Sequence, residues 1–394
     1  MDEPLDQIFT RALSTRSLFK DGRLLRPEYV PDELPFRDAQ ILALGEALAP
    51  ALRGSATSNL FLYGKTGTGK TAVAKYVLTR LAQRSAEGVV SLSFAYSNAR
   101  IAGTQYRLLA DVASALNLSI PFTGLATKEV SERILLRTAQ LKSHVVIVLD
   151  EIDFLVRNFG DDTLYELTRA HDRLANGRIT LIGISNDLKF KDLLDPRVLS
   201  GLSEEEVVFP PYTADQLKTI LRERAESAFF SDVLSQAALS LCAALAGSEH
   251  GDARRALDLL RVSGEVAERE GANNVDERHV RIAIQKIERD RMAESLRSLP
   301  PHEKLVLMAA SEPSTSTGEL YDRYASLCAK LRTAPLTRRR VSALLSDLDL
   351  LGLVSVKLLS QGRYGRTKKA SPLISAALVR EALSDDPSLS GVLS

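Results

Sequence analysis

The stretch "NLFLYGKTGTGKTAVAKYV", residues 59–77, joins an apolar strand, a glycine-rich turn and the start of a helix. From Gly64 to Thr71 it matches the pattern G-x-x-x-x-G-K-[ST], which is specific when a strand precedes it and a helix follows. The glycines let backbone N–H groups face phosphates, and the new helix adds its positive dipole end. The stretch therefore predicts a phosphate-binding loop at the edge of an α/β sheet.

Two side chains of this loop have a predicted chemical role. Lys70 is expected to reach the β- and γ-phosphates of a nucleotide, and Thr71 to place its hydroxyl on Mg²⁺. ATP or ADP with Mg²⁺ is therefore the expected cofactor, and an incidental glycine-rich turn is the alternative. The remaining loop residues are expected to cradle the phosphates: Gly64, Lys65, Thr66, Gly67, Thr68 and Gly69.

A second buried strand, "HVVIVLDEIDFL" at residues 144–155, ends in acidic residues. Runs of this kind are typical of central parallel strands, whose carboxyl ends meet the ligand in open α/β sheets. Asp150 is expected to hold Mg²⁺, and Glu151 to polarise the water that attacks the γ-phosphate. An acidic turn is the alternative for both residues. Asp153 is expected to cap a helix.

A third strand, "ITLIGISND" at residues 179–187, is apolar until Ser185 and Asn186. Polar tips on buried strands need a physical reason. The Asn186 amide is expected to orient the attacking water and contact the γ-phosphate, as the first sensor does in the AAA+ ATPase family, which this arrangement resembles. A turn-forming asparagine is the alternative.

The resemblance to AAA+ ATPases assigns roles to two arginines. Arg197, in "LLDPRVLSGL", occupies the place of the arginine finger, which usually reaches the nucleotide of a neighbouring subunit. A local ion pair is the alternative. Arg254, in "HGDARRALDLLR", matches the second sensor, at the start of a helix that points toward the phosphates. Arg255 is then expected to face solvent or to pair with Asp258.

The resemblance also assigns the segment "YVPDELPFRDAQI", residues 29–41, to the base of the nucleotide. By pattern alone it is a loop, which its prolines stiffen. In AAA+ proteins the segment before the first long helix closes over the adenine. Tyr29, Val30 and Arg37 are therefore the expected base contacts, mostly through their backbone.

Composition describes an ordinary globular chain of 394 residues with 45% hydrophobic content. The sequence has no apolar run long enough for a membrane span, and "MDEPLDQIFTRALSTR" lacks the features of a signal peptide. We therefore expect no membrane association and a cytoplasmic, nucleoid-associated protein. Cys242 and Cys328 have no metal-site or disulfide spacing, so both are expected to be buried without a redox role.

The basic charge is concentrated in one region of the chain. Between Lys330 and Lys369 there are ten lysines and arginines against two aspartates, a net charge of +8, whereas the whole chain carries +1. Such a patch is typical of a polyanion-binding surface, and a solvated face without a partner is the alternative.

Three domains are expected from the hydrophobic periodicity. An α/β nucleotide-binding domain with a parallel sheet covers residues 1–208. The resemblance to AAA+ proteins implies a helical insertion within it, near residues 100–130. A lid domain follows over 209–292, and a C-terminal winged-helix domain covers 293–394. The lid helices are expected at residues 213–228, 233–247, 251–270 and 276–290.

The winged helix is predicted from three amphipathic helices followed by two short strands with a basic, glycine-rich tip. In that fold the third helix enters the major groove by its first residues, and the wing contacts phosphates or the minor groove. A winged helix used for protein contacts is the alternative. The expected DNA contacts are Thr337, Arg338, Arg339 and Arg340 on the helix and Arg363, Tyr364, Arg366, Lys368 and Lys369 on the wing.

Taken in order, these motifs resemble the archaeal origin-recognition initiators, which are relatives of the eukaryotic origin recognition complex and its helicase-loading partner ATPase. The resemblance covers roughly residues 15–370 and rests on "YGKTGTGKT", "LDEID", "DPRVLSGL", "GDARRALDLLR" and "LLGLV…GRYGRTKK". It also implies that the insertion contacts duplex DNA. Phe122 can equally belong to the core. The implied contact loop is Ile120, Pro121, Phe122, Thr123 and Gly124.

The resemblance implies a slow ATPase that acts as a switch. In its ATP form it would bind double-stranded origin DNA and recruit or load the replicative helicase, with other initiator protomers or paralogues as further partners. Two alternatives remain, another winged-helix AAA+ machine such as a branch-migration motor and a nucleotide-switched transcription regulator. Glu151 weighs against the regulator, because a pure sensor can dispense with its base.

Overall fold

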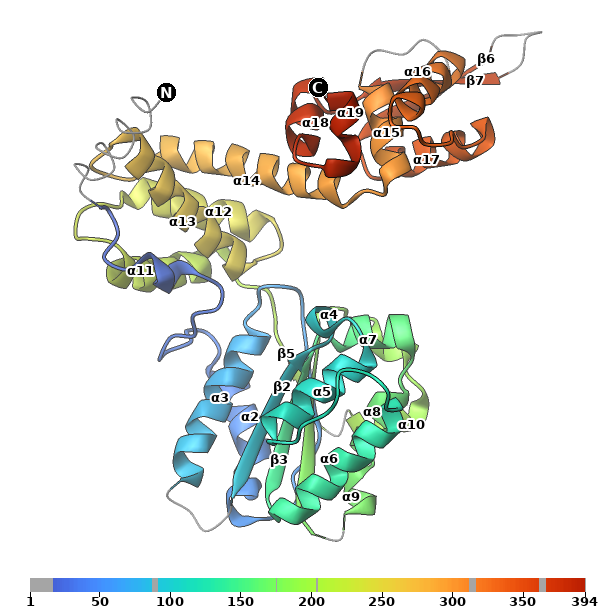
Figure 1. The fold of residues 1–394 in the computed structure, drawn as a ribbon. Helices are drawn as coiled ribbons and strands as arrows, with labels where there is room; N and C mark the ends of the chain where they lie inside the picture. The colour runs from blue at the N-terminus through green and yellow to red at the C-terminus, as the bar shows by residue number, and fades with distance from the viewer. Residues whose placement is uncertain are drawn as a thin grey trace. The chain divides into compact units, whose positions relative to one another are not determined.

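The computed structural model describes residues 17–86, 91–174, 176–202, 205–311, 317–360 and 366–393. The chain folds as two compact units, Met1–Ile282 and Ala283–Ser394 (Figure 1). The first contains a sheet covered by helices and a helical lid. The second contains the winged helix.

A five-stranded parallel sheet lies at the centre of the first unit, with the strand order β2-β3-β4-β1-β5. Its register pairs Tyr63 with Ser185 and Asn98 with Asp150, so the polar strand ends meet at one edge. This confirms the predicted parallel α/β fold. The strands are Leu60–Tyr63 (β1), Leu92–Asn98 (β2), His144–Asp150 (β3), Arg178–Ser185 (β4) and Glu205–Val208 (β5).

Helices cover both faces of this sheet (Figure 1). On one face α2 (Asp38–Leu48) and α3 (Lys70–Ser85) bury leucines and valines against alternate strand residues. The opposite face packs against α5 (Gln105–Ala115), α6 (Thr127–Leu141), α7 (Ile152–Phe159), α8 (Asp162–Thr168) and α10 (Pro196–Leu202). Shorter helical turns complete the two layers: η2 (Ala49–Arg53), α4 (Ala99–Ala102), α9 (Ala170–Arg173) and η3 (Phe190–Leu193). A further turn, η1 (Gly22–Leu25), packs on the helices of the lid.

The lid consists of helices, and each of the first three begins at a side-chain cap. Thr213 forms a capping box, and Ser235 and Asp252 accept from the first-turn N–H groups of their helices. The lid helices are α11 (Ala214–Ala228), α12 (Gln236–Ser248), α13 (Ala253–Glu270) and α14 (Glu277–Ser298).

The N-terminal segment of the described chain is attached to the lid. Phe19 stacks on Phe229 with ring centroids 4.5 Å apart, and the Leu18 N–H donates to Glu268 at 2.7 Å. Gly264 leaves room for the Phe19 ring, because a Cβ at that position would lie 2.3 Å from it. The segment that leads to Tyr29 and Val30 therefore packs on α11 and α13.

Helix α14 is longer than its sequence pattern indicates. The predicted end at residue 290 and the predicted domain boundary at 292 both fall inside it. The helix continues to Ser298 and stops where Leu299 precedes Pro300, because proline disfavours a helical conformation in the residue before it.

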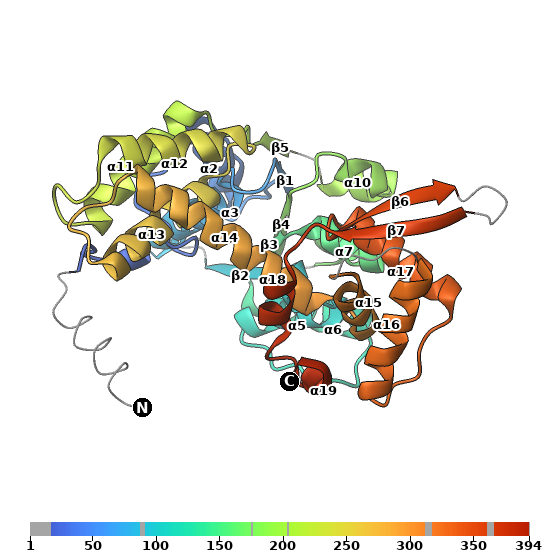
Figure 2. The same ribbon diagram turned by 90° about the horizontal axis from the view of Figure 1, so that it is seen from above.

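The second unit is a winged helix, as predicted. Three helices, α15 (Pro301–Ala310), α16 (Thr317–Lys330) and α17 (Arg338–Leu350), share one apolar core. The antiparallel strands β6 (Val354–Ser360) and β7 (Arg366–Pro372) form the wing (Figure 2). The sequence analysis missed the helices after the wing, which are α18 (Ala376–Leu383), η5 (Pro387–Leu389) and α19 (Ser390–Leu393).

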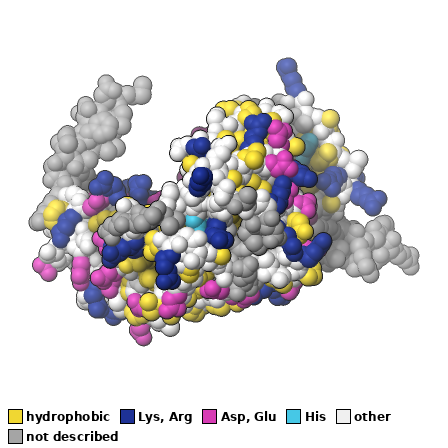
Figure 3. Space-filling model, turned by 90° about the horizontal axis from the view of Figure 1, so that it is seen from below, with side chains coloured by type: hydrophobic (Ala, Val, Ile, Leu, Met, Phe, Trp, Pro, Cys, Tyr) yellow, Lys and Arg dark blue, Asp and Glu magenta, His cyan; other side chains and the backbone are white. Residues whose placement is uncertain are grey.

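The described surface carries mixed charge, and Figure 3 shows basic and acidic side chains interspersed on one face. Cys242 and Cys328 are both buried free thiols, as predicted. Among the described residues, none of the helices is long and apolar enough to cross a membrane.

Candidate functional site

A cavity of about 650 Å³ opens at the carboxyl edge of the parallel sheet. Its floor is formed by the glycine-rich loop and by the ends of β2, β3 and β4, and its walls by α11, α13 and the segment from Leu24 to Pro35. Of the loop residues, those that line it are Gly67, Gly69, Lys70 and Thr71. Gly64, Lys65, Thr66 and Thr68 lie in the same loop without lining the cavity.

The glycines of this loop are required by its backbone and by the lid. Gly67 and Gly69 have φ angles of 71° and 92°, which side chains rarely adopt. A Cβ on Gly67 would lie 1.8 Å from Asp252 Oδ1, and the Ala253 N–H donates to the Gly67 carbonyl at 3.1 Å. The start of α13 therefore rests directly on the phosphate-binding loop.

Lys70 is buried, and its ammonium group is held by the loop. Its Nζ donates to the carbonyl oxygens of Gly64 and Lys65, both at 2.7 Å. Burial, with a smaller contribution from Arg254, lowers the pKa of Lys70 to about 8, although Asp150 opposes the shift. An anion in the cavity would stabilise this desolvated ammonium, so the site fits a polyphosphate.

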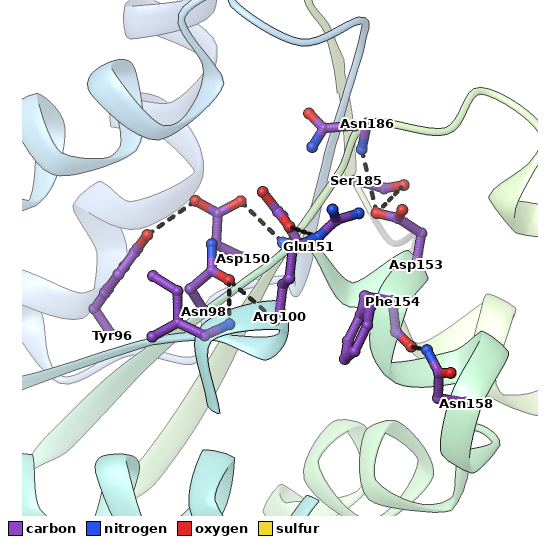
Figure 4. A network of polar contacts seen from close by, with 11 residues as sticks. Tyr96, Asn98, Arg100, Asp150, Glu151, Asp153, Phe154, Asn158, Ser185 and Asn186 are labelled. Atoms are coloured by element: carbon purple, nitrogen blue, oxygen red, sulfur yellow. Dashed lines mark hydrogen bonds and ion pairs between the residues drawn. The ribbon is translucent and has the colours of Figure 1, made fainter. Parts of the chain in front are cut away.

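Two hydroxyl groups converge on the buried Asp150 carboxylate. Thr71 Oγ1 donates to Asp150 Oδ2 at 2.7 Å. The Tyr96 hydroxyl donates to the same oxygen at 3.0 Å (Figure 4). Burial, followed by the nearby Asp150 charge, raises the pKa of Tyr96, so its hydroxyl stays a donor. Oxygen groups of this kind are suitable Mg²⁺ ligands, and Tyr96 was missed because its position depends on the pairing of β2 with β3.

Glu151 lies directly after β3 in a left-handed conformation, with φ at 54°. Its Oε2 is 2.9 Å from Nε of Arg100, which comes from α4 beside the end of β2 (Figure 4). The side chain of Glu151 is 21% exposed, so this ion pair lies at the floor of the cavity. No sequence motif pointed to Arg100.

Asn186 lines the cavity at the end of β4, as predicted from its place after a buried strand. Its backbone N–H lies 3.3 Å from Asp153 Oδ1, which also accepts from the Ser185 hydroxyl at 3.1 Å (Figure 4). Asp153 was expected to cap a helix, and this expectation was wrong. Its carboxylate instead ties α7 to the polar tip of β4.

The lid contributes Arg254, which lines the cavity from the first turn of α13. The expectation for Arg255 was wrong in detail, because it forms an ion pair with Glu249. Asp258 is engaged by Arg261.

The residues predicted to contact the base divide into two groups. Tyr29 and Val30 line the cavity, as expected for contacts to a base. Arg37 is 2% exposed and does not line the cavity. Its guanidinium donates to the carbonyl oxygens of Thr68 at 2.9 Å and Pro210 at 2.7 Å, so it supports the loop from behind.

Arg224, which no sequence motif indicated, holds the wall of the cavity beside Tyr29. Arg224, on α11, donates to the carbonyl oxygens of Leu24 at 3.1 Å and Tyr29 at 3.3 Å. Its guanidinium carbon lies 4.7 Å from the centroid of the Tyr29 ring. Arg224 therefore attaches the segment before α2 to the lid.

Arg197 does not line the cavity of its own chain. Its Nε lies 3.0 Å from Asp195 Oδ1, two residues away, and 68% of the side chain is exposed. Hydrogen bonding to Asp195 raises the pKa of Arg197. Within this chain the local ion pair is formed, and the guanidinium remains accessible to solvent.

The predicted DNA-contact loop lies in the insertion. Phe122 is 98% exposed, so its assignment to the core is excluded. Ile120 packs partly against the core, and the Tyr106 hydroxyl donates to the Pro121 carbonyl. The loop therefore presents an isolated aromatic side chain to solvent.

The predicted recognition helix begins as expected. Thr337 is its N-cap and accepts from the Arg340 N–H at 3.4 Å, and Thr337 to Arg340 are all exposed. Lys369 on β7 is exposed too. Arg363 and Tyr364 lie outside the described residues, and so do the side chains of Arg366 and Lys368.

Family models match three consecutive parts of the chain. They are an AAA domain over residues 53–189, the Cdc6 AAA+ ATPase-type lid domain over residues 218–285 and the C-terminal winged-helix domain of CDC6 over residues 294–382. The AAA+ domain is of a nucleotide-binding type, in agreement with the geometry of the cavity.

Curated relatives extend this similarity over nearly the whole chain. The ORC1-type DNA replication protein 1 of Sulfurisphaera tokodaii is 46% identical over 394 residues, which cover 98% of each chain. The ORC1-type DNA replication protein of Thermococcus onnurineus is 48% identical over 402 residues, covering 100% of this chain and 97% of the relative.

A solved structure of the Aeropyrum pernix ORC1 protein, in complex with DNA, matches with a TM-score of 0.83 and 49% identity. The match covers 94% of this chain and 98% of that one. Because identity near one half extends over nearly the full length of its relatives, this chain belongs to the ORC1-type DNA replication proteins.

Proposed function

We propose that this protein is an ATP-dependent replication initiator that binds double-stranded origin DNA and helps to recruit or load the replicative helicase. The observation that carries the proposal is the cavity in which Lys70, Asp150, Glu151, Asn186 and Arg254 meet. These residues come from the glycine-rich loop, two strand ends and the lid. A nucleotide contacted by all of them would couple its phosphates to the position of the lid.

In this proposal the loop and the lid hold the nucleotide. Lys70 would bind the β- and γ-phosphates, and Arg254 would contact the phosphates from α13. Tyr29 and Val30 would contact the base. ATP and ADP differ by the γ-phosphate, so the ATP form would hold the lid differently from the ADP form.

Thr71 and Asp150 would hold Mg²⁺, which neutralises phosphate charge when bound. Their oxygens lie 2.7 Å apart in a hydrogen bond that coordination would replace. Tyr96 donates to the same Asp150 oxygen and would keep the carboxylate oriented.

Glu151 would act as the general base, and Asn186 would orient the water. Because Arg100 engages Glu151, the base is restrained, and this fits slow hydrolysis used as a switch. Arg197 would act as a finger on the nucleotide of another protomer or paralogue, which its exposure permits. Hydrolysis would reset the ATP-bound initiator.

DNA would be contacted by the start of α17, the wing and the insertion loop. Phosphate contacts would supply most of the salt-dependent affinity, while side chains that reach base edges or read groove shape would select the site. Binding to the chromosome would place the protein on the nucleoid.

The first test is duplex binding measured by fluorescence anisotropy, with an origin fragment and a scrambled duplex over a salt series, in ATP and in ADP. Initiator function predicts preference for the origin by roughly a thousandfold. Equal, salt-sensitive binding to both duplexes would favour a DNA-tracking motor instead. Absence of binding would assign the winged helix to protein contacts.

The second test separates a switch from a motor with Glu151→Gln. Hydrolysis is expected to fall by about a hundredfold or more, because the base is lost. ATP affinity and origin binding should remain, since neither needs the base. Glu129→Gln on the exposed face of α6 is the matched control. Loss of origin binding by a folded, ATP-bound Glu151→Gln protein would contradict the proposal.

A further inference from the structure

The backbone directly before the recognition helix is held by two tyrosines of α16. Leu336 immediately precedes the N-cap of α17. The Tyr321 hydroxyl donates to the Leu336 carbonyl at 3.0 Å, and the Leu336 N–H donates to the Tyr324 hydroxyl at 3.1 Å. Both backbone polar groups of this residue are therefore fixed by side chains from one helix.

The Tyr324 hydroxyl has little freedom to rearrange. Tyr324 is fully buried, and its oxygen lies 2.7 Å from Nδ1 of His302 on α15. The same oxygen accepts from the Leu336 N–H, so groups on two other segments hold it in place. Burial raises the pKa of Tyr324 to about 12, so the proton stays on the hydroxyl.

Tyr321 also contacts the first arginine of the recognition helix. The guanidinium carbon of Arg338 lies 5.1 Å from the centroid of the Tyr321 ring. Asp322, the next residue on α16, has a carboxylate oxygen 3.9 Å from the Arg338 guanidinium. The side chain of Arg338 is nevertheless 72% exposed. These contacts therefore restrict its direction and leave it accessible to a ligand.

We propose that Tyr321 and Tyr324 are positioning residues for DNA binding, and the inference rests on the proposed function. They fix where α17 begins, and Tyr321 restricts the directions that Arg338 can take. Arginine has many rotamers in solution, and ordering it on binding costs free energy. A side chain that is already guided loses less freedom when it meets DNA.

The main experiment is a double-mutant cycle in the full-length protein. Tyr321→Phe keeps the ring under Arg338 and removes only the hydroxyl. Origin affinity is expected to fall roughly three- to tenfold, as for the loss of one hydrogen bond. Arg338→Ala should weaken binding roughly tenfold and reduce the salt slope by about one. Because the hydroxyl fixes the start of α17, it also positions Arg339 and Arg340. The double variant should therefore bind more weakly than Arg338→Ala alone, but by less than the product of the two single effects.

Thr333→Val is the matched control, because Thr333 lies in the same connector and its hydroxyl bonds to Leu331 instead of Leu336. It should leave origin affinity unchanged. An unchanged affinity in Tyr321→Phe, or effects of Tyr321→Phe and Arg338→Ala that multiply in the double variant, would overturn the inference.

A second readout needs no DNA. Tyr324→Phe removes the acceptor of the Leu336 N–H, so amide hydrogen exchange should accelerate over residues 336–340 and stay unchanged elsewhere in the winged helix. Exchange that accelerates throughout the unit would show a general loss of stability and overturn a specific role for Tyr324. Tyr321 is only partly buried, so Tyr321→Phe decides the question if Tyr324→Phe does not fold.

The two proposals fail in distinguishable ways. If the wild-type protein does not bind duplex DNA, the proposed function fails, and this inference fails with it. If the wild type binds and Arg338→Ala weakens binding while the tyrosine variants bind normally, only the positioning role is overturned.

Discussion

Strand β3 begins with His144 and ends with Asp150, two buried titratable side chains that each contact two hydroxyl groups. Of these two, Asp150 lines the cavity described above and His144 does not. His144 is 2% exposed, and its Nε2 lies 2.7 Å from the Thr180 hydroxyl and 3.2 Å from that of Thr57. Asp150 is 5% exposed and accepts from Thr71 and Tyr96. The same strand therefore has a closed polar end and an open one.

The difference lies in where the hydroxyl groups come from. Thr57 and Thr180 flank His144 on neighbouring segments of the sheet and bond to each other, so they close that edge. At the other edge, Thr71 belongs to the helix after the glycine-rich loop, which curves away and leaves the cavity open. Burial of a polar group thus has opposite uses. A closed end stabilises the fold, whereas an open end binds a ligand.

The largest expected effect is on ATP affinity, at the open end of β3. Lys70→Ala should weaken ATP binding by ~100-fold, because a charge-assisted contact to phosphate contributes about 2–3 kcal/mol. The melting temperature of the nucleotide-free protein should not fall, since a desolvated ammonium is removed. Calorimetric titration measures the affinity, and Arg80→Ala on the same helix is the control. A strongly destabilised Lys70→Ala protein would contradict this comparison, because the open end of β3 would then stabilise the fold as the closed end does.

A smaller effect is expected at the closed end. Burial lowers the pKa of His144 to about 4. The unfolded chain, with a histidine pKa near 6.5, then binds more protons below about pH 6.5, so stability falls as the pH falls toward about 4. Between about pH 7 and about pH 5 the loss should be up to about 2 kcal/mol.

His144→Gln should remove this share of the pH dependence, measured by urea unfolding of both proteins at the two pH values. An amide can still bond to Thr180. ATP affinity should be unchanged at either pH. Equal pH dependence in both proteins would show that the pKa of His144 is the same in the folded and unfolded states, and would contradict this prediction.

The smallest expected effect concerns the hydroxyl of Tyr96. Tyr96→Phe keeps the ring and removes the donor to Asp150, so Mg²⁺-dependent ATP affinity should fall roughly three- to tenfold. Affinity measured in EDTA should be unchanged, because the phosphate contacts of the loop remain. An equal loss with and without Mg²⁺ would mean that Tyr96 supports the cavity and not the carboxylate.

Much of the site could be predicted because its motifs are local. The glycine-rich loop, the acids after β3 and Asn186 after β4 each follow from a strand that ends in polar residues. The errors concern partners. Asp153 looked like a cap because it sits in the first turn of α7, but its partners are on β4, 32 and 33 residues away. The side-chain partners of Arg37 could not be foreseen either, because its carbonyl acceptors belong to residues 31 and 173 positions away.

By itself the sequence determined the order of the domains, the phosphate-binding loop and the place of the basic helix, because these depend on periodicity and on short motifs. Only the tertiary structure decided that Tyr96 meets Asp150, that Arg100 engages Glu151 and that Tyr321 guides Arg338. Such contacts depend on strand pairing and on helices that pack across long stretches of chain. That packing determines which partner a side chain contacts, whereas the chemistry of the side chain follows from its residue type, which the sequence gives directly.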